Sequence, residues 1–398
     1  MSKDGSMKEV LVLAYYFPPR GGSGVQRPVK FVKYLEEFGY RPRVVALDKS
    51  VLNGQMPKDG EMLSDITGKE VHYVTLNRTE LIQAKVASLK VTRYTPSLYW
   101  SWWTHAATRV CSDICESNKP DVLFTTVSPF SSVKTAASIS RKYDIPWVLD
   151  MRDPWALDPI SFYPTRLHYT SELAMMKNAC RDADAVIMNT PQSLEALKEK
   201  FPELPKEKLF YITNGWDRDD FNGFENSTAN KERSKKLTIV HTGRFYTGYS
   251  TKVNPDSRLA VSGRRLKPQD WLRYSFGHSN MLARTPYYLF TALRKLIDNG
   301  TINENDIQLI FVGQTTAEDK KLVQLFDLEK ITEFKGYMHH RDSIAALQAA
   351  DLLFLPLHEP EGGKPALIVP GKTYEYLAAG VPILGLVPPG DVRNYLRE

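Results

Sequence analysis

Cysteine is scarce in this chain: 398 residues contain three, Cys111, Cys115 and Cys180. An odd and sparse set is no disulfide framework, and the amino terminus leads into a strand instead of an apolar export segment. We therefore expect a reducing, cytoplasmic compartment. Cys111 and Cys115 would share one helix face, but no histidine or further cysteine converges on them, so the sequence predicts packing and no metal site.

Long apolar runs are absent as well. No stretch approaches the roughly 20 apolar residues that would span a bilayer. A zinc-finger spacing, an aromatic RNA-binding motif and a dense basic helix are also missing, which argues against nucleic acid as a partner. Lys and Arg outnumber Asp and Glu by 52 to 46, a net charge of +6, so the chain is drawn only mildly toward phosphates or acidic lipid surfaces.

What is present is the balance of an ordinary globular protein, with 25% charged and 42% hydrophobic residues. Short β-rich apolar runs alternate with helical patterns from end to end, which favours parallel sheets covered by helices on both faces. The length allows two such domains. A polar stretch at 222–236 predicts the boundary, with one Rossmann-like domain at 1–230 and a second at 231–398.

The pattern predicts individual elements in both domains. Expected strands of the first domain are Glu9–Tyr15, Arg43–Leu47, Asp121–Thr126, Trp147–Asp150 and Ala185–Asn189. A first helix should follow the glycine-rich turn after the first strand and end near Glu37, and further helices are expected at Ser131–Tyr143 and Pro191–Lys200. Expected strands of the second are Leu237–His241, Ile307–Val312, Ile331–Phe334, Asp351–Leu355 and Pro382–Leu386, with helices Pro286–Asn299, Ala317–Phe326, Asp342–Ala349 and Lys372–Ala379. The stretch Thr247–Ala283 lacks periodicity and is basic, so we expect an insertion there, either solvated or functional.

A glycine-rich loop joins the first expected strand to its helix, with Gly21 and Gly22 near its centre. Glycine lets backbone N–H groups approach an anion, and a helix amino terminus adds partial positive charge. A phosphate or a sugar hydroxyl would suit such a loop. Its spacing matches neither the Walker loop nor the Rossmann fingerprint, and a tight structural turn remains open as the other interpretation.

Charged residues follow two of the expected strands. Asp150, Arg152 and Asp153 end an apolar strand, where α/β domains direct side chains toward a ligand, although Arg152 and Asp153 could instead pair with each other. In the second domain, Arg244 follows the first strand and Arg284 begins the first helix. Arginine suits phosphate through its forked donors, so these two cations could neutralise a diphosphate.

A last segment opens a helix with Pro370 and Gly371, followed by Lys372 and, one turn in, Glu375. A carboxylate at that position can accept hydrogen bonds from two ribose hydroxyls. A favourable interaction of Glu375 with the helix dipole is the simpler reading, but it does not account for the whole segment.

In their order along the chain, these motifs resemble the retaining glycosyltransferases of family 4, which have the GT-B fold. The resemblance covers nearly the whole chain, through Tyr16–Arg27, Asp150–Trp155, Ile212–Asp217, His241–Tyr246, Arg284–Pro286 and Pro370–Leu384. It implies two doubly wound Rossmann-like domains facing a central cleft. It also implies a metal-independent, retaining hexosyltransferase that needs no cofactor and uses a nucleotide diphosphate sugar as co-substrate.

The resemblance also suggests roles for residues at the donor site. It places Gly21 and Gly22 beside the donor phosphates and the acceptor. Arg284, with Arg244, would hold the diphosphate and Glu375 the ribose. Gly371 and Lys372 belong to the same donor-binding segment.

Two departures from the family pattern bear on catalysis. Many relatives carry an acidic residue eight positions before the ribose-binding glutamate, where this chain has Leu367. Glu361, or Glu359 beside it, is a candidate substitute from a longer loop, and Glu361 joins Asp150, Arg152 and Asp153 as a candidate catalytic residue. The chain also stops at Glu398, where relatives continue into further helices, so we expect a piece of a longer protein.

The acceptor is indicated only by a mixture of aromatic and basic residues. These are Lys90, Arg93, Tyr94, Tyr99, Trp100, Trp102, Trp103 and Arg109. A surface that touches anionic lipid or a lipid-linked sugar would have this composition. A core helix with cations reaching to the surface explains the same residues, so both interpretations stay open.

The sequence thus predicts transfer of a sugar to a glycan or lipid-linked acceptor in cell-surface polysaccharide biosynthesis. The enzyme would be cytoplasmic, with a peripheral position on the inner face of the membrane left open. Its partners would be the nucleotide-sugar donor, the acceptor and an anionic membrane surface, without nucleic acid. A nucleotide-sugar epimerase of the same fold and a non-catalytic sugar-nucleotide-binding subunit are the alternatives.

Overall fold

The computed structural model describes residues 7–51, 61–87, 100–222, 236–247, 251–253, 260–262, 274–275 and 279–397. The chain divides into two compact units, Met1–Thr213 with Leu272–Phe276, and Asn214–Trp271 with Gly277–Glu398. Each unit is built on one parallel sheet, so the prediction of two Rossmann-like α/β domains is confirmed. The boundary expected between residues 230 and 231 lies outside the described residues.

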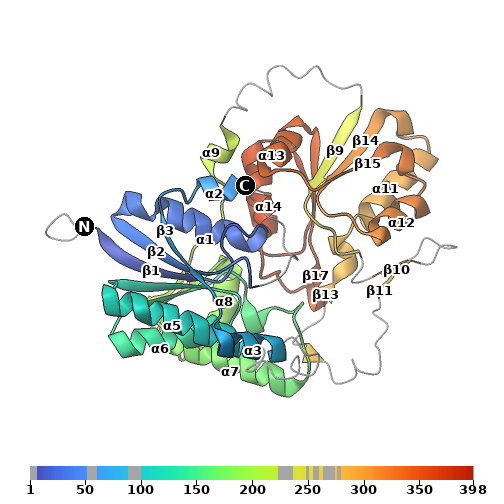
Figure 1. Cartoon of the computed structure of the whole chain (residues 1–398). Helices are drawn as coiled ribbons and strands as arrows, with labels where there is room; N and C mark the ends of the chain where they lie inside the picture. Colours follow the sequence, from blue (N-terminus) through green and yellow to red (C-terminus); the bar gives the residue numbers. More distant parts are fainter. Residues whose placement is uncertain are drawn as a thin grey trace. The chain divides into compact units, whose positions relative to one another are not determined.

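The first unit contains a seven-stranded parallel sheet, coloured blue to green in Figure 1. From edge to edge its strands are β3 (Glu70–Val74), β2 (Tyr40–Leu47), β1 (Lys8–Ala14), β4 (Val122–Val127), β5 (Trp147–Met151), β7 (Ala185–Met188) and β8 (Leu209–Tyr211). The order reverses between β1 and β4. The carboxyl ends of these two strands therefore border the switch point at which open α/β sheets bind ligands.

Helix α1 (Ser23–Tyr34) covers one face of this sheet because its valines recur at helical spacing. Val29 and Val32 are fully buried and belong to one apolar cluster with Val12 of β1. Leu13, the next residue of β1, points to the opposite face and is equally buried. Burial of consecutive residues is what a strand covered on both sides requires.

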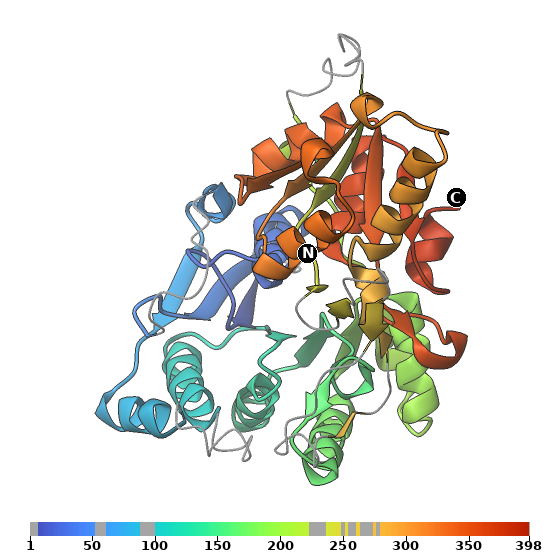
Figure 2. The same ribbon diagram turned by 90° about the vertical axis from the view of Figure 1, so that its right-hand side faces the viewer.

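The opposite face carries a row of helices, side by side in both views (Figures 1 and 2). They are α3 (Arg78–Ala87), α5 (Ser101–Ser117), α6 (Ser132–Tyr143) and α7 (Arg166–Asp182). Also in this unit are α2 (Glu61–Ser64), α8 (Pro191–Lys200) and the 3-10 turns Leu35–Phe38, Trp155–Leu157 and Lys206–Lys208. Helix α8 begins at Pro191 because Thr190 and Ser193 cap it reciprocally.

The second unit contains a five-stranded parallel sheet. Its strands, in spatial order, are β15 (Thr332–Gly336), β14 (Ile307–Val312), β9 (Leu237–Thr242), β16 (Leu352–Pro356) and β18 (Ile383–Leu386). Its helices are α9 (Arg218–Phe221), α11 (Tyr287–Asp298), α12 (Ala317–Leu325), α13 (His340–Ala349), α14 (Gly371–Ala379) and α15 (Asp391–Tyr395). Short 3-10 turns lie at Met281–Arg284, Glu304–Asp306, Glu329–Ile331 and Glu361–Gly363.

Two apolar clusters fill the two faces of this sheet. Helices α11 and α12 cover one face, and α13 and α14 cover the other (Figure 1). Ile239 packs in the cluster that contains Phe290 of α11, whereas the next residue of β9, Val240, packs in the cluster that contains Tyr376 of α14. This alternation follows from the two-residue period of a strand.

The alternation of strands and helices was predicted well. Helix α8 and strand β14 have the predicted bounds, and the other predicted elements differ by a few residues at their ends. The sequence did not predict strands β3 and β8 or helix α7. It also did not predict the short pairs that β6 (Phe162–Tyr163) makes with β12 (Tyr274–Ser275), β10 (Thr251–Val253) with β11 (Ala260–Ser262), and β13 (Ser279–Asn280) with β17 (Glu359–Pro360).

Much of the basic insertion expected at 247–283 lies outside the described residues. Its described parts form antiparallel pairs: β10 with β11, β12 with β6 of the first unit, and β13 with β17. Part of this stretch therefore has regular structure that the lack of periodicity concealed.

The described members of the aromatic and basic group belong mostly to the core. Trp102 and Trp103 are 5% and 0% exposed, and Trp103 Nε1 donates to Ser132 Oγ at 2.9 Å. Arg109 donates twice to the buried Glu80, at 3.2 and 3.0 Å. For these residues the core-helix interpretation is confirmed. Outside the described residues lie Lys90, Arg93, Tyr94 and Tyr99.

The three cysteines are buried and free, which confirms the predicted packing. Burial raises the pKa of the Cys180 thiol to about 12 and that of Cys111 still further. Among the described residues, no group of His, Cys, Asp or Glu could hold a metal ion. No helix in the described ranges has the length and apolar character needed to cross a membrane.

Candidate functional site

The carboxyl ends of the central strands in the second unit lie beside helix α14. Strand β9 ends at Thr242, and Gly243 follows in the left-handed region with φ 94°. The Gly243 N–H donates to the carbonyl of Val312, at the end of β14, over 2.7 Å. A Cβ on Gly243 would lie 2.8 Å from Lys372 Nζ. A missing side chain thus leaves room for the lysine ammonium at this edge.

Lys372, the second residue of α14, is hydrogen-bonded to a buried histidine. Its Nζ lies 3.1 Å from His241 Nε2, and His241 Nδ1 lies 2.8 Å from the carbonyl oxygen of Phe354. A carbonyl can only accept, so Nδ1 carries the ring proton and Nε2 accepts from Lys372. The ring of His241 is also stacked on Phe245, with centroids 4.1 Å apart.

Arg284 has a similar environment. It ends the 3-10 turn Met281–Arg284, and its guanidinium carbon lies 4.1 Å from the centroid of the Tyr246 ring. Its Nη1 lies 3.4 Å from Nδ1 of His358, a histidine that is 1% exposed. The Tyr246 N–H donates to the Arg284 carbonyl at 3.4 Å. The loop after β9 therefore meets the Arg284 segment through Tyr246, while Arg244 itself is exposed.

The electrostatics of this cluster follow from burial and from the two cations. Although part of Lys372 reaches the surface, the surrounding protein desolvates its ammonium group, and this effect, with the charge of Arg284, lowers its pKa to about 7. Burial, reinforced by Arg284, lowers the pKa of His358 to about 3. Burial and the Lys372 charge also keep the pKa of His241 well below its usual value. An anion placed here would stabilise the protonated lysine.

Glu375 lies one turn further along α14. Its Oε1 accepts from His340 Nε2 at 3.0 Å, and His340 Nδ1 lies 3.8 Å from Asp220 Oδ2 of α9. Among the described residues, no other hydrogen bond to the Glu375 carboxylate is found, so its second oxygen can accept from a ligand. The carboxylate is 17% exposed.

The amino terminus of α14 offers backbone donors. Pro370 at the N-cap provides no side-chain cap, and the first turn, with Gly371 and Lys372, contains no acidic residue. The free N–H groups and the helix dipole both favour an anion there. Lys372 adds a side-chain cation to the same turn.

Glu361 belongs to a different segment from the groups described above. It begins the 3-10 turn Glu361–Gly363 and is exposed, and the two glycines after it have φ 71° and 67°. In the described part of the chain, no ion pair or hydrogen bond joins Glu361 to Lys372, Arg284 or Glu375. Leu367 is partly buried. The structure thus offers no contact that makes Glu361 the replacement acid, and its catalytic role stays a prediction.

In the first unit, Asp150 is fully buried at the end of β5. Arg27 of α1 donates to it through Nη2 at 2.6 Å and through Nε at 3.0 and 3.1 Å, and Thr126 Oγ1 donates at 2.9 Å. Arg27 also donates to the carbonyl of Thr213 at 3.1 Å. Asp150 therefore binds protein groups that fix α1 to the sheet, and its geometry gives no support to direct contact with a substrate.

Arg152 and Asp153 form the pair that the sequence left open, with Nε and Oδ2 3.5 Å apart. Arg152 Nη1 also donates to the carbonyl of Gly24 at 2.5 Å, and its guanidinium lies over the ring of Tyr16. A Cβ on Gly24 would occupy the place of this guanidinium. Arg152 thus holds the start of α1, while Asp153 keeps about half of its side-chain surface exposed.

Gly21 and Gly22 lie at the uncapped start of α1. Gly22 is the N-cap, with φ 109°, and no side chain caps the helix. Its carbonyl accepts from Val25 N–H at 2.9 Å, while Gly21 is buried. The first turn contains no acidic residue, so this end also favours an anion.

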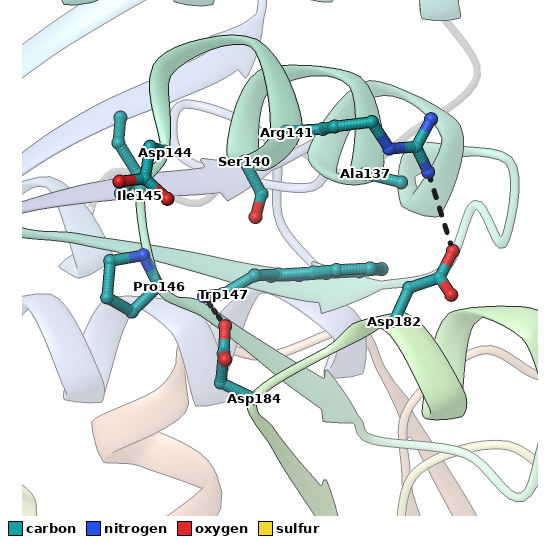
Figure 3. A pocket seen from close by; sticks show the side chains of 9 residues that line it. All are labelled: Ala137, Ser140, Arg141, Asp144, Ile145, Pro146, Trp147, Asp182 and Asp184. Atoms are coloured by element: carbon teal, nitrogen blue, oxygen red, sulfur yellow. Dashed lines mark hydrogen bonds and ion pairs between the residues drawn. The ribbon is translucent and has the colours of Figure 1, made fainter.

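A shallow hollow of about 550 Å³ lies elsewhere on the first unit, with three carboxylates around it (Figure 3). Trp147 and Asp184 place it at the amino ends of β5 and β7, the sheet edge opposite to Asp150. Asp184 accepts from the Trp147 N–H at 2.8 Å, and Asp182 pairs with Arg141 at 3.6 Å. None of the predicted site residues lines this hollow.

Two family models match the chain. Residues 63–220 match Glycosyltransferase Family 4, and residues 280–394 match Glycosyl transferases group 1. The chain contains two glycosyltransferase domains. The first match falls mainly in the first unit of this glycosyltransferase and the second in its second unit, with Arg284 and Glu375 inside it. No curated protein sequence matches the chain.

Solved structures share the fold of this glycosyltransferase. Sucrose-phosphate synthase from Thermosynechococcus elongatus aligns with a TM-score of 0.56 at 13% identity, over 94% of this chain and 80% of its own. HepE from Anabaena, in complex with UDP and glucose, aligns with a TM-score of 0.52 at 16% identity, and α,α-trehalose 6-phosphate synthase from Burkholderia multivorans with 0.52 at 10%. Both cover 94% of this chain and 80% of their own. These likenesses show the GT-B fold.

Sequence reasoning missed four residues, one in the first unit and three in the second. Arg27, His241, His340 and His358 received no role of their own, yet each holds a predicted site residue. Their partners lie 35 to 131 positions away along the chain. The available signal was a polar residue at the end of an apolar strand, as at His241 and His358, which marks the sheet edge but not the partner.

Proposed function

We propose that this glycosyltransferase moves a sugar from a nucleotide diphosphate sugar to a glycan or lipid-linked acceptor in cell-surface polysaccharide biosynthesis. The proposal includes retention of the anomeric configuration and a mechanism without a metal ion. It assigns Lys372, Arg284 and Arg244 to the diphosphate, Gly371 to backbone contacts with it, and Glu375 to the ribose.

One observation supports the donor site above all. Lys372 is hydrogen-bonded to His241 near the end of β9, and Arg284 contacts the loop that follows β9, so both cations lie at the carboxyl edge of the second sheet, near the uncapped start of α14. A cluster of cations favours a negatively charged ligand such as a diphosphate. The negative charge of the diphosphate increases when the glycosidic bond breaks. Fixed cations and helix N–H groups can stabilise that developing charge. The free oxygen of Glu375 lies one helical turn further, where the ribose of the nucleotide would follow.

The donor base and sugar are proposed from the solved relatives. HepE was crystallised with UDP and with UDP-glucose, so we take UDP-glucose as the first donor to test. Gly21 and Gly22 would lie beside the donor phosphates and the acceptor, because α1 begins with free N–H groups there, and Arg152 and Asp153 would serve catalysis at the same end of α1.

Helix α3 presents apolar side chains that suit contact with a membrane. Three apolar side chains of α3 are exposed: Leu81, Ile82 and Val86, at 46%, 57% and 46%. Together with Lys85 on the same helix, they suit peripheral contact with an anionic membrane surface that presents a lipid-linked sugar. Binding to vesicles with and without anionic lipid would measure this contact.

The test combines donor binding with turnover. Thermal shifts with a panel of nucleotide diphosphate sugars should show stabilisation of the wild type by one donor, in proportion to its affinity. Glu375→Ala should reduce that shift. Equal shifts of both proteins with every donor would contradict the site. Product analysis with lipid-linked acceptors then distinguishes transfer from epimerisation, and binding without turnover would favour a non-catalytic partner subunit.

A further inference from the structure

Two buried histidines contact the two cations of the proposed donor site, Lys372 and Arg284. His241 accepts from Lys372 and His358 accepts from Arg284. We propose, building on the proposed function, that these histidines act as neutral supports: they fix both cations in place for a diphosphate without cancelling their charge.

The hydrogen bonds themselves require the neutral state. His241 Nδ1 must carry its proton toward the Phe354 carbonyl, which leaves Nε2 as the acceptor for Lys372. His358 Nδ1 faces Arg284, whose guanidinium can only donate, so the His358 proton is on Nε2. Each histidine is 1% exposed, and a charged imidazole beside a cation would be strongly disfavoured there.

A carboxylate is the usual partner of a buried cation, and here the chain does not use one for Lys372. In the described part of the chain, Lys372 forms no ion pair. Glu375, the acid on the same helix, is hydrogen-bonded to His340. A carboxylate in place of His241 would pair with the ammonium and compete with the phosphate oxygens of a ligand, whereas a neutral acceptor orients the ammonium and leaves its charge for the ligand.

The histidines also hold the cations to the sheet. His241 is the last residue but one of β9 and stacks on Phe245, and His358 follows strand β16. Both rings are therefore fixed by the sheet, and the flexible Lys372 and Arg284 side chains are ordered before a ligand arrives. Ordering in advance reduces the entropy that binding must otherwise overcome.

The experiment compares two substitutions of similar size at each histidine. His241→Gln keeps a neutral acceptor, whereas His241→Glu places a carboxylate beside Lys372, and neither variant has the imidazole Nδ1–H that donates to Phe354. UDP binding is measured by titration calorimetry, with the melting temperature as the check of folding. His105→Glu, at an exposed site on α5 of the first unit, repeats the change of charge at a residue with no proposed role in the donor site.

We expect His241→Gln to stay within about threefold of wild-type UDP affinity and His241→Glu to lose at least about tenfold. With Lys372→Ala in the background, the difference between the two should disappear. Equal affinities for the Gln and Glu variants, in a wild type that binds UDP, would overturn the inference and leave the donor site standing. A wild type that binds no nucleotide diphosphate would instead overturn the proposed function on which it rests.

If His241→Glu fails to fold, the pair His358→Gln and His358→Glu tests the same inference at Arg284. A tenfold difference between these two supports it, and equal UDP affinities contradict it. In active samples, KM for the donor should rise and kcat should fall in the Glu variants, because the cations that the histidines position bind the diphosphate and also stabilise the charge that develops on it as the bond breaks.

Discussion

Lys372 has its charge set by its surroundings. Desolvation, and then the positive charge of Arg284, lower its pKa to about 7, so the free protein contains both the neutral and the charged form near neutral pH. A bound diphosphate favours the charged form and raises this pKa. Binding then takes up a proton in the pH range between the free and the bound value.

This protonation leads to the first prediction. UDP affinity should be highest below about pH 7 and should decrease as the pH rises above it, because an increasing share of Lys372 must first be protonated. Calorimetric titrations at about pH 8 in HEPES and in Tris buffer measure the proton uptake, since the buffers differ in ionisation enthalpy and neither is a phosphate that competes with UDP. Lys372→Arg keeps its charge and should show little uptake. Identical proton uptake by the wild type and Lys372→Arg on binding UDP would exclude Lys372 as the group that takes up the proton.

Asp150 leads to a second prediction at the residue scale. Its carboxylate neutralises the buried Arg27, so Asp150→Asn should leave a buried guanidinium without its anion and cost about 3–5 kcal/mol of folding stability. Urea unfolding measures this loss. Asp153→Asn, at a half-exposed neighbour, is the control and should change stability little. A stable Asp150→Asn protein with normal UDP binding and no transfer would instead show that Asp150 is catalytic.

At the scale of elements, the site depends on the close approach of strand ends and one helix. Gly243 follows β9 with φ 94°, and its missing side chain leaves space for Lys372 on α14. Tyr376, fully buried on the same helix, accepts from the Thr242 N–H at 2.8 Å and fixes α14 against the end of β9. A change of one methyl group at this junction should therefore be felt at the cation.

Gly243→Ala should both strain the backbone and displace the ammonium, and we expect UDP affinity to fall about tenfold. Gly300→Ala is a matched control, because Gly300 has φ 72° but nothing within 4 Å of an added Cβ. Both variants should lose a comparable amount of melting temperature. If both also retain wild-type UDP affinity, Gly243 does not make room for a ligand-binding lysine.

How far the sequence could predict the elements depended on their length. Helix α8 and strand β14 match their predicted bounds because a reciprocal cap and an apolar run between turns are local signals. Two-residue strands such as β13 and β17 have no pattern of their own and form only because another segment lies beside them. The same holds for the partners of Lys372 and Asp150, which are fixed by tertiary contacts.

At the scale of the whole molecule, two parallel sheets and two glycosyltransferase domain matches agree with the order of motifs in the sequence. The predicted site residues differ in their surroundings. Lys372 contacts the end of β9 and Arg284 the loop after it, with Glu375 one turn along α14, whereas Asp150 and Arg152 support α1, and Glu361 is exposed. The sequence shows the type of each residue and its position at the end of a strand. It does not show which of these side chains are already hydrogen-bonded to other parts of the protein.

The most direct test of the donor site is the affinity of UDP for the wild type, for Lys372→Ala and for Lys198→Ala, measured by titration calorimetry. Lys198, on α8, pairs with Glu195 on the surface and controls for the loss of one lysine charge. We predict that Lys372→Ala binds UDP at least about tenfold more weakly while Lys198→Ala binds as the wild type does. Equal affinities for all three proteins would contradict a diphosphate site at the start of α14.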